Sequence, residues 1–273
     1  MQKATRGSSR KQSTGLQATA LILYSLVSLN PLFIMQHSSK IVLFQSPPEP
    51  CSYLDNHTAR NVYADPFRPP TMPLYNGLIQ KGFRRSGDYL YRPHCEQCEK
   101  CISARIIVDE FKPNRSQKRA ANANRDLTFS REPAEFTDEY FELYCRYLSS
   151  RHKDAGMDNP AQTDFERFLI SDWCDTEFCA LRLDGQLLAV AVTDMVSTGL
   201  SSVYTYFDPD FPKRSLGTAC IVKQVDFARD LGLEYVYLGY WIEACEKMSY
   251  KSCYKPQERY VNDNWVKVAK NSV

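Results

Sequence analysis

The chain has 273 residues, of which 43% are hydrophobic and 12% aromatic, so it is long enough for two modest domains and too apolar for a disordered protein. Its net charge of +2 is uneven, because the first 34 residues carry +4 without any acid and the remainder therefore carries −2. Overall charge gives no argument for nucleic-acid binding, but residues 81–131 hold 12 Lys and Arg against 6 Asp and Glu, which predicts a local basic surface for phosphate or carboxylate groups.

Residues 1–34 differ from the rest of the chain. A basic start leads into a largely apolar run, 16–35, which has features of a signal peptide or a membrane anchor. Polar residues interrupt this run, however, and no small-x-small cleavage pattern follows it. We therefore expect a non-structural extension, disordered or arising from an early start codon, with Met35 as the functional start.

Residues 35–131 are predicted to form an N-terminal domain. Residues 61–75 hold four prolines and are expected to be irregular, and 82–88 are expected to be a turn. The predicted strands are 41–44, 89–91 and 104–108, and the predicted helices are 74–82 and 116–124.

Residues 132–273 are predicted to form a C-terminal domain, with the boundary at the Arg-Glu-Pro sequence 131–133. An Asp184-Gly185 turn predicts a hairpin between 178–183 and 186–195. The other predicted elements are helices 136–150 and 163–170 with Thr163 as cap, strand 202–207, a helix that follows Gly217 and stops at Gly232, strand 235–242, and a basic loop at 248–260.

A basic glycine loop joins strand 202–207 to the next helix. The first turn of a helix has unpaired N–H groups, Gly217 lets a ligand approach the backbone, and Arg214 adds a charged donor. The pattern Arg-x-x-Gly-x-Ala resembles the acyl-donor loop of the acetyltransferase-like (GNAT-like) fold. We therefore predict an α/β chain with a mixed sheet of this type, although a single glycine between two elements is often only a turn.

Ten cysteines are present, and three of them form Cys95-x-x-Cys98-x-x-Cys101. This spacing suits thiolate ligands of zinc or an iron–sulfur cluster, with His94, Cys51 or Cys145 as the fourth ligand. The alternative is three ordinary thiols in a loop, because no second CxxC pair exists. The remaining cysteines are scattered, which indicates a reducing compartment such as the cytoplasm.

Several motifs together resemble the aminoacyl-tRNA–protein transferases, most closely the bacterial branch of aspartate/glutamate leucyltransferases, which are related to the eukaryotic arginyltransferases. The motifs are Tyr91-Arg-Pro-His-Cys-x-x-Cys-x-x-Cys101, Ala104-Arg105, Phe111-x-Pro-x-Arg-Ser-Gln-x-Arg119, Asn124-x-Asp126-Leu127, Ser215-Leu-Gly217-Thr218, Tyr237-Leu-Gly-Tyr-Trp-Ile242 and Lys247-Met-x-Tyr-Lys251. The resemblance covers roughly 51–260. It implies a GNAT-like fold and transfer of leucine from leucyl-tRNA to an N-terminal Asp or Glu, which marks the acceptor for degradation by the N-degron pathway.

Such a reaction uses an ester that is already activated, so it needs positioning, help with one proton and no required cofactor. Asp208 is the first candidate for the proton, with Tyr206 and Asp194 beside it at strand ends. A bidentate arginine would suit the acidic acceptor side chain. The candidate acceptor-binding residues are Arg92, Arg105, Arg115 and Arg119, and the candidate tRNA-binding residues are Arg214, Gly217, Thr218, Lys247 and Lys251. Lys247 and Lys251 share a face if their segment is helical.

Three alternatives remain open from the sequence. The donor is arginyl-tRNA in one, and the chain is an acyl-CoA N-acetyltransferase in another. In the third, it is a metal-stapled RNA-binding module without catalysis.

Overall fold

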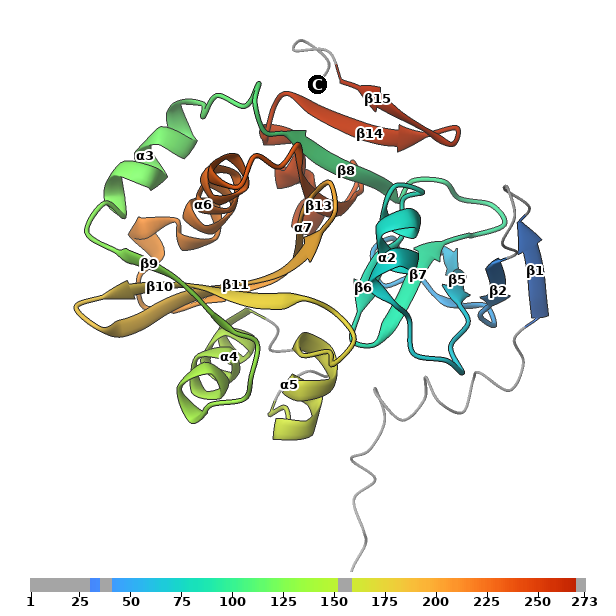
Figure 1. Ribbon diagram of the computed structural model, residues 1–273, viewed down its shortest axis with the longest axis horizontal. Coiled ribbons are helices and arrows are strands. Elements are labelled where there is room, and N and C mark those ends of the chain that lie inside the picture. The colour runs from blue at the N-terminus through green and yellow to red at the C-terminus, as the bar shows by residue number, and fades with distance from the viewer. Residues whose placement is uncertain (1–29, 35–40, 152–158, 269–273) are drawn as a thin grey trace, which may run out of the picture.

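The computed structural model describes residues 30–34, 41–151 and 159–268 (Figure 1). Strand β1, Asn30–Ile34, belongs to the predicted extension and pairs antiparallel with β2, Ile41–Gln45. The rest of the extension, 1–29, lies outside the described residues, and so does Met35, the predicted functional start. Within the part of the chain that is described, no helix has the length and apolar character required to cross a bilayer.

An eight-stranded mixed sheet forms the centre of the molecule. Only β12 and β13 pair in parallel, and every other neighbouring pair is antiparallel. In spatial order the strands are β15 (Asn264–Lys267), β14 (Gln257–Val261), β8 (Ile102–Ile107), β13 (Tyr235–Trp241), β12 (Gly199–Phe207), β11 (Gln186–Val196), β10 (Thr176–Leu183) and β9 (Thr128–Pro133).

Helices cover both faces of this sheet, as Figure 1 shows. Helices α3 (Arg115–Ala123) and α6 (Leu216–Asp230) lie on one face, and α4 (Asp138–Arg151) and α5 (Gln162–Leu169) lie on the other. Because both faces are covered, β11 is an almost continuous buried apolar run. A helix-covered mixed sheet confirms the α/β class that the sequence predicts.

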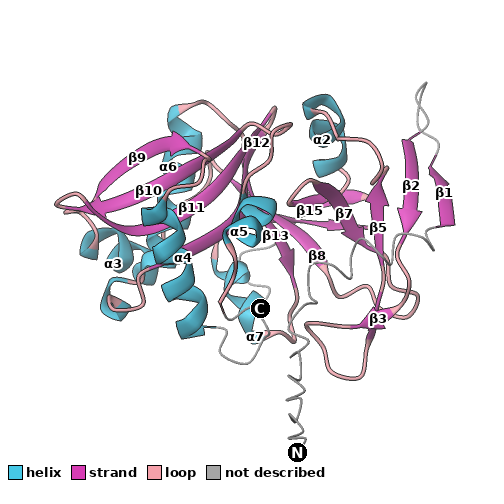
Figure 2. Cartoon of the chain, turned by 90° about the horizontal axis from the view of Figure 1, so that it is seen from below, coloured by secondary structure: helices cyan, strands magenta, loops and turns pink. Residues whose placement is uncertain are grey.

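A smaller sheet lies beside the part of the large one that holds β8 and β15, as Figure 2 shows. Its spatial order is β1, β2, β5 (Asn61–Ala64), β7 (Tyr89–Pro93) and β6 (Arg84–Ser86), and α2 (Met72–Ile79) packs against it. Tyr237 of the large sheet belongs to the same buried cluster. The two sheets therefore share a core. The remaining short elements are β3 (Glu49–Pro50), β4 (Thr58–Ala59), α7 (Glu246–Ser249) and two 3-10 turns, η2 (Pro212–Arg214) and η3 (Tyr250–Cys253).

Most predicted elements are present. Asp184 and Gly185 have φ values of 48° and 90°, as the predicted two-residue hairpin turn requires. The predicted turn at 82–88 is wrong in part, because 84–86 form strand β6 before the chain turns at Gly87. Residues 61–64 and 257–261, expected as irregular and as loop, are strands β5 and β14. The N-cap of helix α5 is Ala161, and the Asp164 carboxylate accepts a hydrogen bond from its N–H. Thr163, the expected cap, lies within the helix.

The predicted division between two domains falls inside β9. Strand β8 comes from the first predicted domain and pairs on both sides with strands of the second, β13 and β14. The first half of the chain therefore supplies strands to both sheets.

Candidate active site

The two parallel strands at the centre of the large sheet separate partway along their length. Residues Gly199–Ser201 of β12 pair with Tyr235–Tyr237 of β13. Both strands continue beyond these three pairs without pairing to each other. Beyond this point β12 stays paired with β11, and β13 stays paired with β8. The carboxyl halves of the two parallel strands are thus not paired with each other, and this separation is the opening between β12 and β13. In α/β proteins, ligands bind at the carboxyl ends of parallel strands.

A bulge on each strand accompanies the separation. Val203 is the extra residue on β12, between the pairs that Ser202 and Tyr204 form with β11. Leu238 is the extra residue on β13, immediately after Tyr237. Since a bulge bends and twists its strand, the two bulges bend β12 and β13 at the place where they part.

Arg84 of β6 fills the apex of this opening. Its Nη2 donates to the carbonyl of Ser202 at 2.6 Å, and its Nη1 donates to the carbonyl of Tyr237 at 3.1 Å. One guanidinium thus bridges the two strands at the point where their pairing ends. Gly239, with φ of 81°, lies under the guanidinium, where a Cβ would stand 3.2 Å from Arg84 Cζ.

Lys251 of η3 reaches the same stretch of β13. Its Nζ donates to the carbonyl of Tyr240 at 2.7 Å, and only 7% of the residue is exposed. Burial, followed by the charge of Arg84, lowers the pKa of Lys251 to about 7. Lys247 is exposed on α7, so the prediction that it shares a face with Lys251 is wrong: the first lysine faces solvent and the second is buried.

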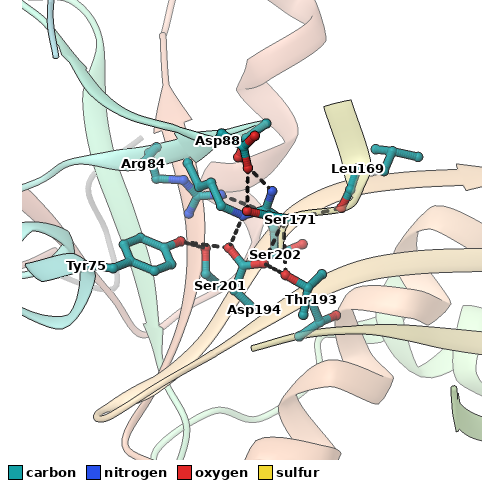
Figure 3. Close-up of polar contacts among 12 residues, drawn as sticks. Tyr75, Arg84, Asp88, Leu169, Ser171, Thr193, Asp194, Ser201 and Ser202 are labelled. Carbon is teal, nitrogen blue, oxygen red and sulfur yellow. Dashed lines mark hydrogen bonds and ion pairs between the residues drawn. The ribbon is translucent and has the colours of Figure 1, made fainter. Parts of the chain in front are cut away.

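Arg85, the next residue along β6, points to the opposite side and meets Asp194. Tyr75 donates to Asp194 Oδ2 at 3.0 Å, and Thr176 donates to Oδ1 at 2.8 Å (Figure 3). With both arms of Arg85 added, every oxygen of this carboxylate is engaged in the core. Asp194, which was predicted to be catalytic, therefore serves as an ion-pair and hydrogen-bond partner inside the core.

Asp208 and Tyr206, the other predicted catalytic residues, lie near the end of β12. Arg146 donates to Asp208 Oδ1 at 2.6 Å, whereas Asp208 Oδ2 is buried and has no hydrogen-bond partner among the described residues. Tyr206 is fully buried among the aromatic side chains of α4 and α5, and burial raises its pKa well above the usual value. The hydroxyl of Tyr206 likewise has no hydrogen-bond partner among the described residues, so each of these two side chains has one buried oxygen without a partner.

The glycine loop begins α6 as predicted, but Arg214 faces α3. Its two Nη atoms lie 2.8 Å from the carboxylate oxygens of Asp126, in a two-armed ion pair. Ser215, in the left-handed region, precedes the helix without a side-chain cap, which leaves the first N–H groups of α6 without a side-chain acceptor. Gly217 packs on Phe207, where a Cβ would come within 3.1 Å of the ring. Thr218 sits in the same first turn.

The four predicted acceptor-binding arginines are not gathered in one place. Arg105 lies 3.5 Å from the ring centroid of Tyr235 and 4.2 Å from that of Trp265, and it is paired with Glu258 at 2.6 Å, so it secures the sheet. Arg92 donates to the carbonyl of Lys81 at 3.0 Å. Arg115 and Arg119 are exposed on α3.

The sequence analysis missed Arg84. Two adjacent arginines between Phe83 and Gly87 form the signal that could have indicated it. Neighbouring residues of a strand point to opposite faces, so at least one of the pair must enter the protein.

The thiols of the cysteine cluster are neighbours. Cys95 and Cys98 form a β-bridge, and burial followed by the charges of Cys95, Cys51 and Cys98 raises the pKa of Cys101 to about 12. Cys145 belongs to α4 instead. Across the described residues, no three His, Cys, Asp or Glu side chains converge into a group that could hold a metal ion. The ligand set is therefore not assembled here, and metal binding stays a prediction.

Comparison with known proteins assigns the chain to a family. Residues 49–119 match the family model described as arginine-tRNA-protein transferase, N terminus, and residues 139–261 match the one described as its C terminus. The aspartate/glutamate leucyltransferase of Alcanivorax borkumensis is 47% identical over 231 residues, which cover 85% of this chain and 96% of the relative. The protein of that name from Pseudomonas aeruginosa is 46% identical over 232 residues, with 85% and 99% covered.

Similarity to solved structures is weaker. FemX gives a TM-score of 0.41 at 10% identity, covering 78% of this chain and 80% of that one. L-PGS from Bacillus licheniformis gives 0.42 at 16% identity, covering 63% and 50%. The two family models and the near-full-length relatives are sufficient: the chain belongs to the arginine-tRNA-protein transferase family.

Proposed function

We propose that this chain transfers leucine from leucyl-tRNA to the N-terminal Asp or Glu of acceptor proteins and so marks them for degradation. The observation that carries the proposal is the 46–47% identity to relatives named aspartate/glutamate leucyltransferase, of which the chain covers 96–99%. Family membership favours this activity over an acyl-CoA N-acetyltransferase and over an RNA-binding module without catalysis.

We infer an acetyltransferase-like arrangement of the site. Its support is the parallel pair β12 and β13, which separates at Ser201 and Tyr237, and the uncapped start of α6 directly after β12. The ester of the aminoacyl-tRNA and the acceptor amine would meet in this opening. The acceptor nitrogen forms a bond to the ester carbonyl carbon, the ester C–O bond breaks, and the ribose hydroxyl leaves with a proton.

The protein must supply positioning and a proton acceptor. About a tenth of an α-amine with a pKa near 8 is unprotonated at neutral pH, so one proton acceptor is enough to produce the nucleophile. Asp208 stays our candidate, because its Oδ2 is buried and unpartnered among the described residues. We assign no proton transfer to Asp194, whose two carboxylate oxygens are already bonded in the core, or to Tyr206, whose raised pKa keeps the phenol protonated and unable to accept a proton.

Helix α3 is our candidate for holding the tRNA backbone. Its three exposed cations are Arg115, Lys118 and Arg119, and no acidic side chain among the described residues pairs with them. The first turn of the helix is joined to η3, because Gln117 donates to the carbonyl of Cys253 at 3.2 Å. Its last turn is joined to η2, because Arg214 donates to the carbonyl of Ala123 at 2.8 Å. Exposed cations of this kind bind phosphates without sequence preference.

The reaction as proposed needs no cofactor, because the donor ester supplies the activation. We propose that it takes place in the cytoplasm, where aminoacyl-tRNA is found. The cysteine cluster stays a candidate for zinc or an iron–sulfur cluster with a structural effect, and no step of the reaction is assigned to it.

Transfer of labelled amino acids tests the proposal. Leucyl-tRNA and arginyl-tRNA are each supplied with peptides that begin with Asp, Glu, Lys or Ala. We expect labelled leucine on the Asp and Glu peptides alone. Absence of product from either donor, with tRNA still bound, would leave a binding module in its place.

Arginine transfer is the second candidate. The family models that match this chain carry the name of the arginine enzymes, which favours it at the level of the family. Labelled arginine on the acidic peptides, without leucine, would identify the chain as an arginyl-transferring member.

A further inference from the structure

Two buried cations meet in the opening between β12 and β13 without an anion. Arg84 is 6% exposed and Lys251 is 7% exposed. Both donate to backbone carbonyls, and no acidic side chain within 41–151 or 159–268 forms an ion pair with either one. A buried charge without a counter-charge is costly, and this makes the pair a candidate site for an anionic ligand.

The two side chains converge on adjacent residues of one strand. The guanidinium of Arg84 lies over Gly239, because a Cβ there would stand 3.2 Å from Cζ and 3.3 Å from Nε. The ammonium of Lys251 lies 2.7 Å from the carbonyl oxygen of Tyr240. Only a residue without Cβ lets the guanidinium rest on the strand in this way. The charge of Arg84 also contributes to lowering the pKa of Lys251, as expected for neighbouring cations.

The ligand of this site must be small. A tRNA backbone phosphate approaches exposed side chains, as on α3, and neither of these cations is exposed. The planar fork of an arginine matches a carboxylate with two parallel hydrogen bonds, and only two of the N–H groups of Arg84 are engaged by carbonyls.

We propose that Arg84 and Lys251 bind the side-chain carboxylate of the acceptor's N-terminal Asp or Glu and thereby set the specificity of the enzyme for acidic N-termini. This rests on the function proposed above. In an acidic N-terminal residue the carboxylate is only a few bonds from the reacting α-amine. Binding it in the strand opening therefore holds the amine in the opening too. A neutral Asn or Gln leaves both cations unpaired, and a site built for a charged group rejects such analogues strongly.

A comparison of matched peptides tests this assignment. Steady-state kcat/KM for leucine transfer is measured with peptides that differ only in beginning with Glu or Gln, and with Asp or Asn. The variants are Arg84→Gln and Lys251→Met, and the controls are Arg68→Gln and Lys81→Met at exposed cations. We expect each site variant to lower the rate for the Glu peptide more than tenfold and to change the rate for the Gln peptide less than threefold, whereas the controls keep the wild-type ratio.

The outcomes separate this assignment from the proposed function. An equal fall for both peptides would mean that the cations act on the donor or the fold, and would overturn the assignment alone. Lack of transfer by the wild-type chain would overturn both. Circular dichroism reports whether each variant folds. If Arg84→Gln does not fold, the test uses Lys251→Met, which removes the charge, and Lys251→Arg, which keeps it. The assignment would be refuted if Lys251→Met left the ratio of the Glu rate to the Gln rate at its wild-type value. It would also be refuted if Lys251→Arg lowered this ratio as much as Lys251→Met.

Discussion

Arg85 and Asp194 form a two-armed ion pair in which neither side chain has any exposed surface. The Nε–Oδ2 and Nη2–Oδ1 distances are 2.8 Å and 2.7 Å. Arg85 comes from the small sheet and Asp194 from the large one, so this pair joins the two sheets through their shared core. Since Arg84 is the adjacent residue, the same pair also fixes the strand that carries the cation of the proposed acceptor site.

Breaking that pair should destabilise the protein strongly. Replacing Asp194 by Ala leaves a buried guanidinium uncompensated, and we expect the free energy of unfolding to fall by about 3–5 kcal/mol in urea titrations. Glu177→Ala, which breaks the partly exposed pair with Arg131, should cost about 1 kcal/mol or less. Similar losses in the two variants would argue against the buried pair as a structural link.

Arg214 can be tested separately from its ion pair with Asp126. If Arg214 holds the donor, Arg214→Ala should lower kcat/KM for leucine transfer at least tenfold. Asp126→Asn should change it less than threefold, because the guanidinium remains. Equal losses would show that the ion pair merely fixes η2 against α3. A turnover unchanged by Arg214→Ala would remove its assignment to donor binding.

The cations of α3 should account for part of the salt dependence of tRNA binding. Replacing Arg115, Lys118 and Arg119 together by Gln should weaken binding and reduce the slope of log K against log salt by roughly one for each lost phosphate contact. Fluorescence anisotropy with labelled tRNA at several salt concentrations measures this. A slope equal to that of the wild type would place the tRNA backbone on another face.

Lys251 should make folding stability depend on pH. Its pKa is about 7 in the folded chain and near 10.4 when unfolded. Between these values the unfolded chain binds more protons, so raising the pH stabilises the folded state, by at most about 1.4 kcal/mol per unit. Lys251→Met removes this contribution. The stability of the wild type relative to the variant should therefore rise from pH 7 to pH 9, and urea titrations across this range measure the difference.

Titrations of cysteines and tyrosines are common to both proteins and cancel in this comparison. The exposed Lys81→Met variant serves as control and should follow the wild type. A difference between wild type and Lys251→Met that stays constant with pH would contradict the lowered pKa.

Chelation should leave the reaction intact. Because the donor ester is already activated, we expect leucine transfer to persist after treatment with a strong chelator and desalting, with any metal loss visible only as a lower melting temperature. Elemental analysis before and after treatment, with Cys98→Ser alongside, shows whether a metal was present. Loss of transfer that added zinc restores would assign the metal a part in the reaction.

Local patterns account for most of what the sequence predicts correctly. The Asp184-Gly185 turn and the helix that ends before Gly232 depend on backbone conformations that only certain residues adopt readily. Strand β14 was not predicted because its residues pair with β8, about 150 positions earlier in the chain. Long-range pairing of this kind leaves no periodic signal in a single sequence.

The candidate site shows the same division. Asp208 stays a candidate that its place at a strand end indicates, whereas the ion pairs of Arg105 with Glu258 and of Arg214 with Asp126 were not predicted. A single sequence does not distinguish an arginine that binds a ligand from one that stabilises a sheet. Arg84 was missed because its role depends on the separation of two strands that lie more than 100 residues further along the chain.

The place of β8 between β13 and β14 has a consequence for synthesis on the ribosome. Arg105 on β8 is enclosed by Tyr235, Trp265 and Glu258, all near the end of the chain. A nascent chain that has emerged through α3 therefore carries β8 with both edges unpaired until more than 100 further residues have been made. We expect this strand to be the segment most in need of chaperone protection, and the two parts matched by separate family models to depend on each other for folding.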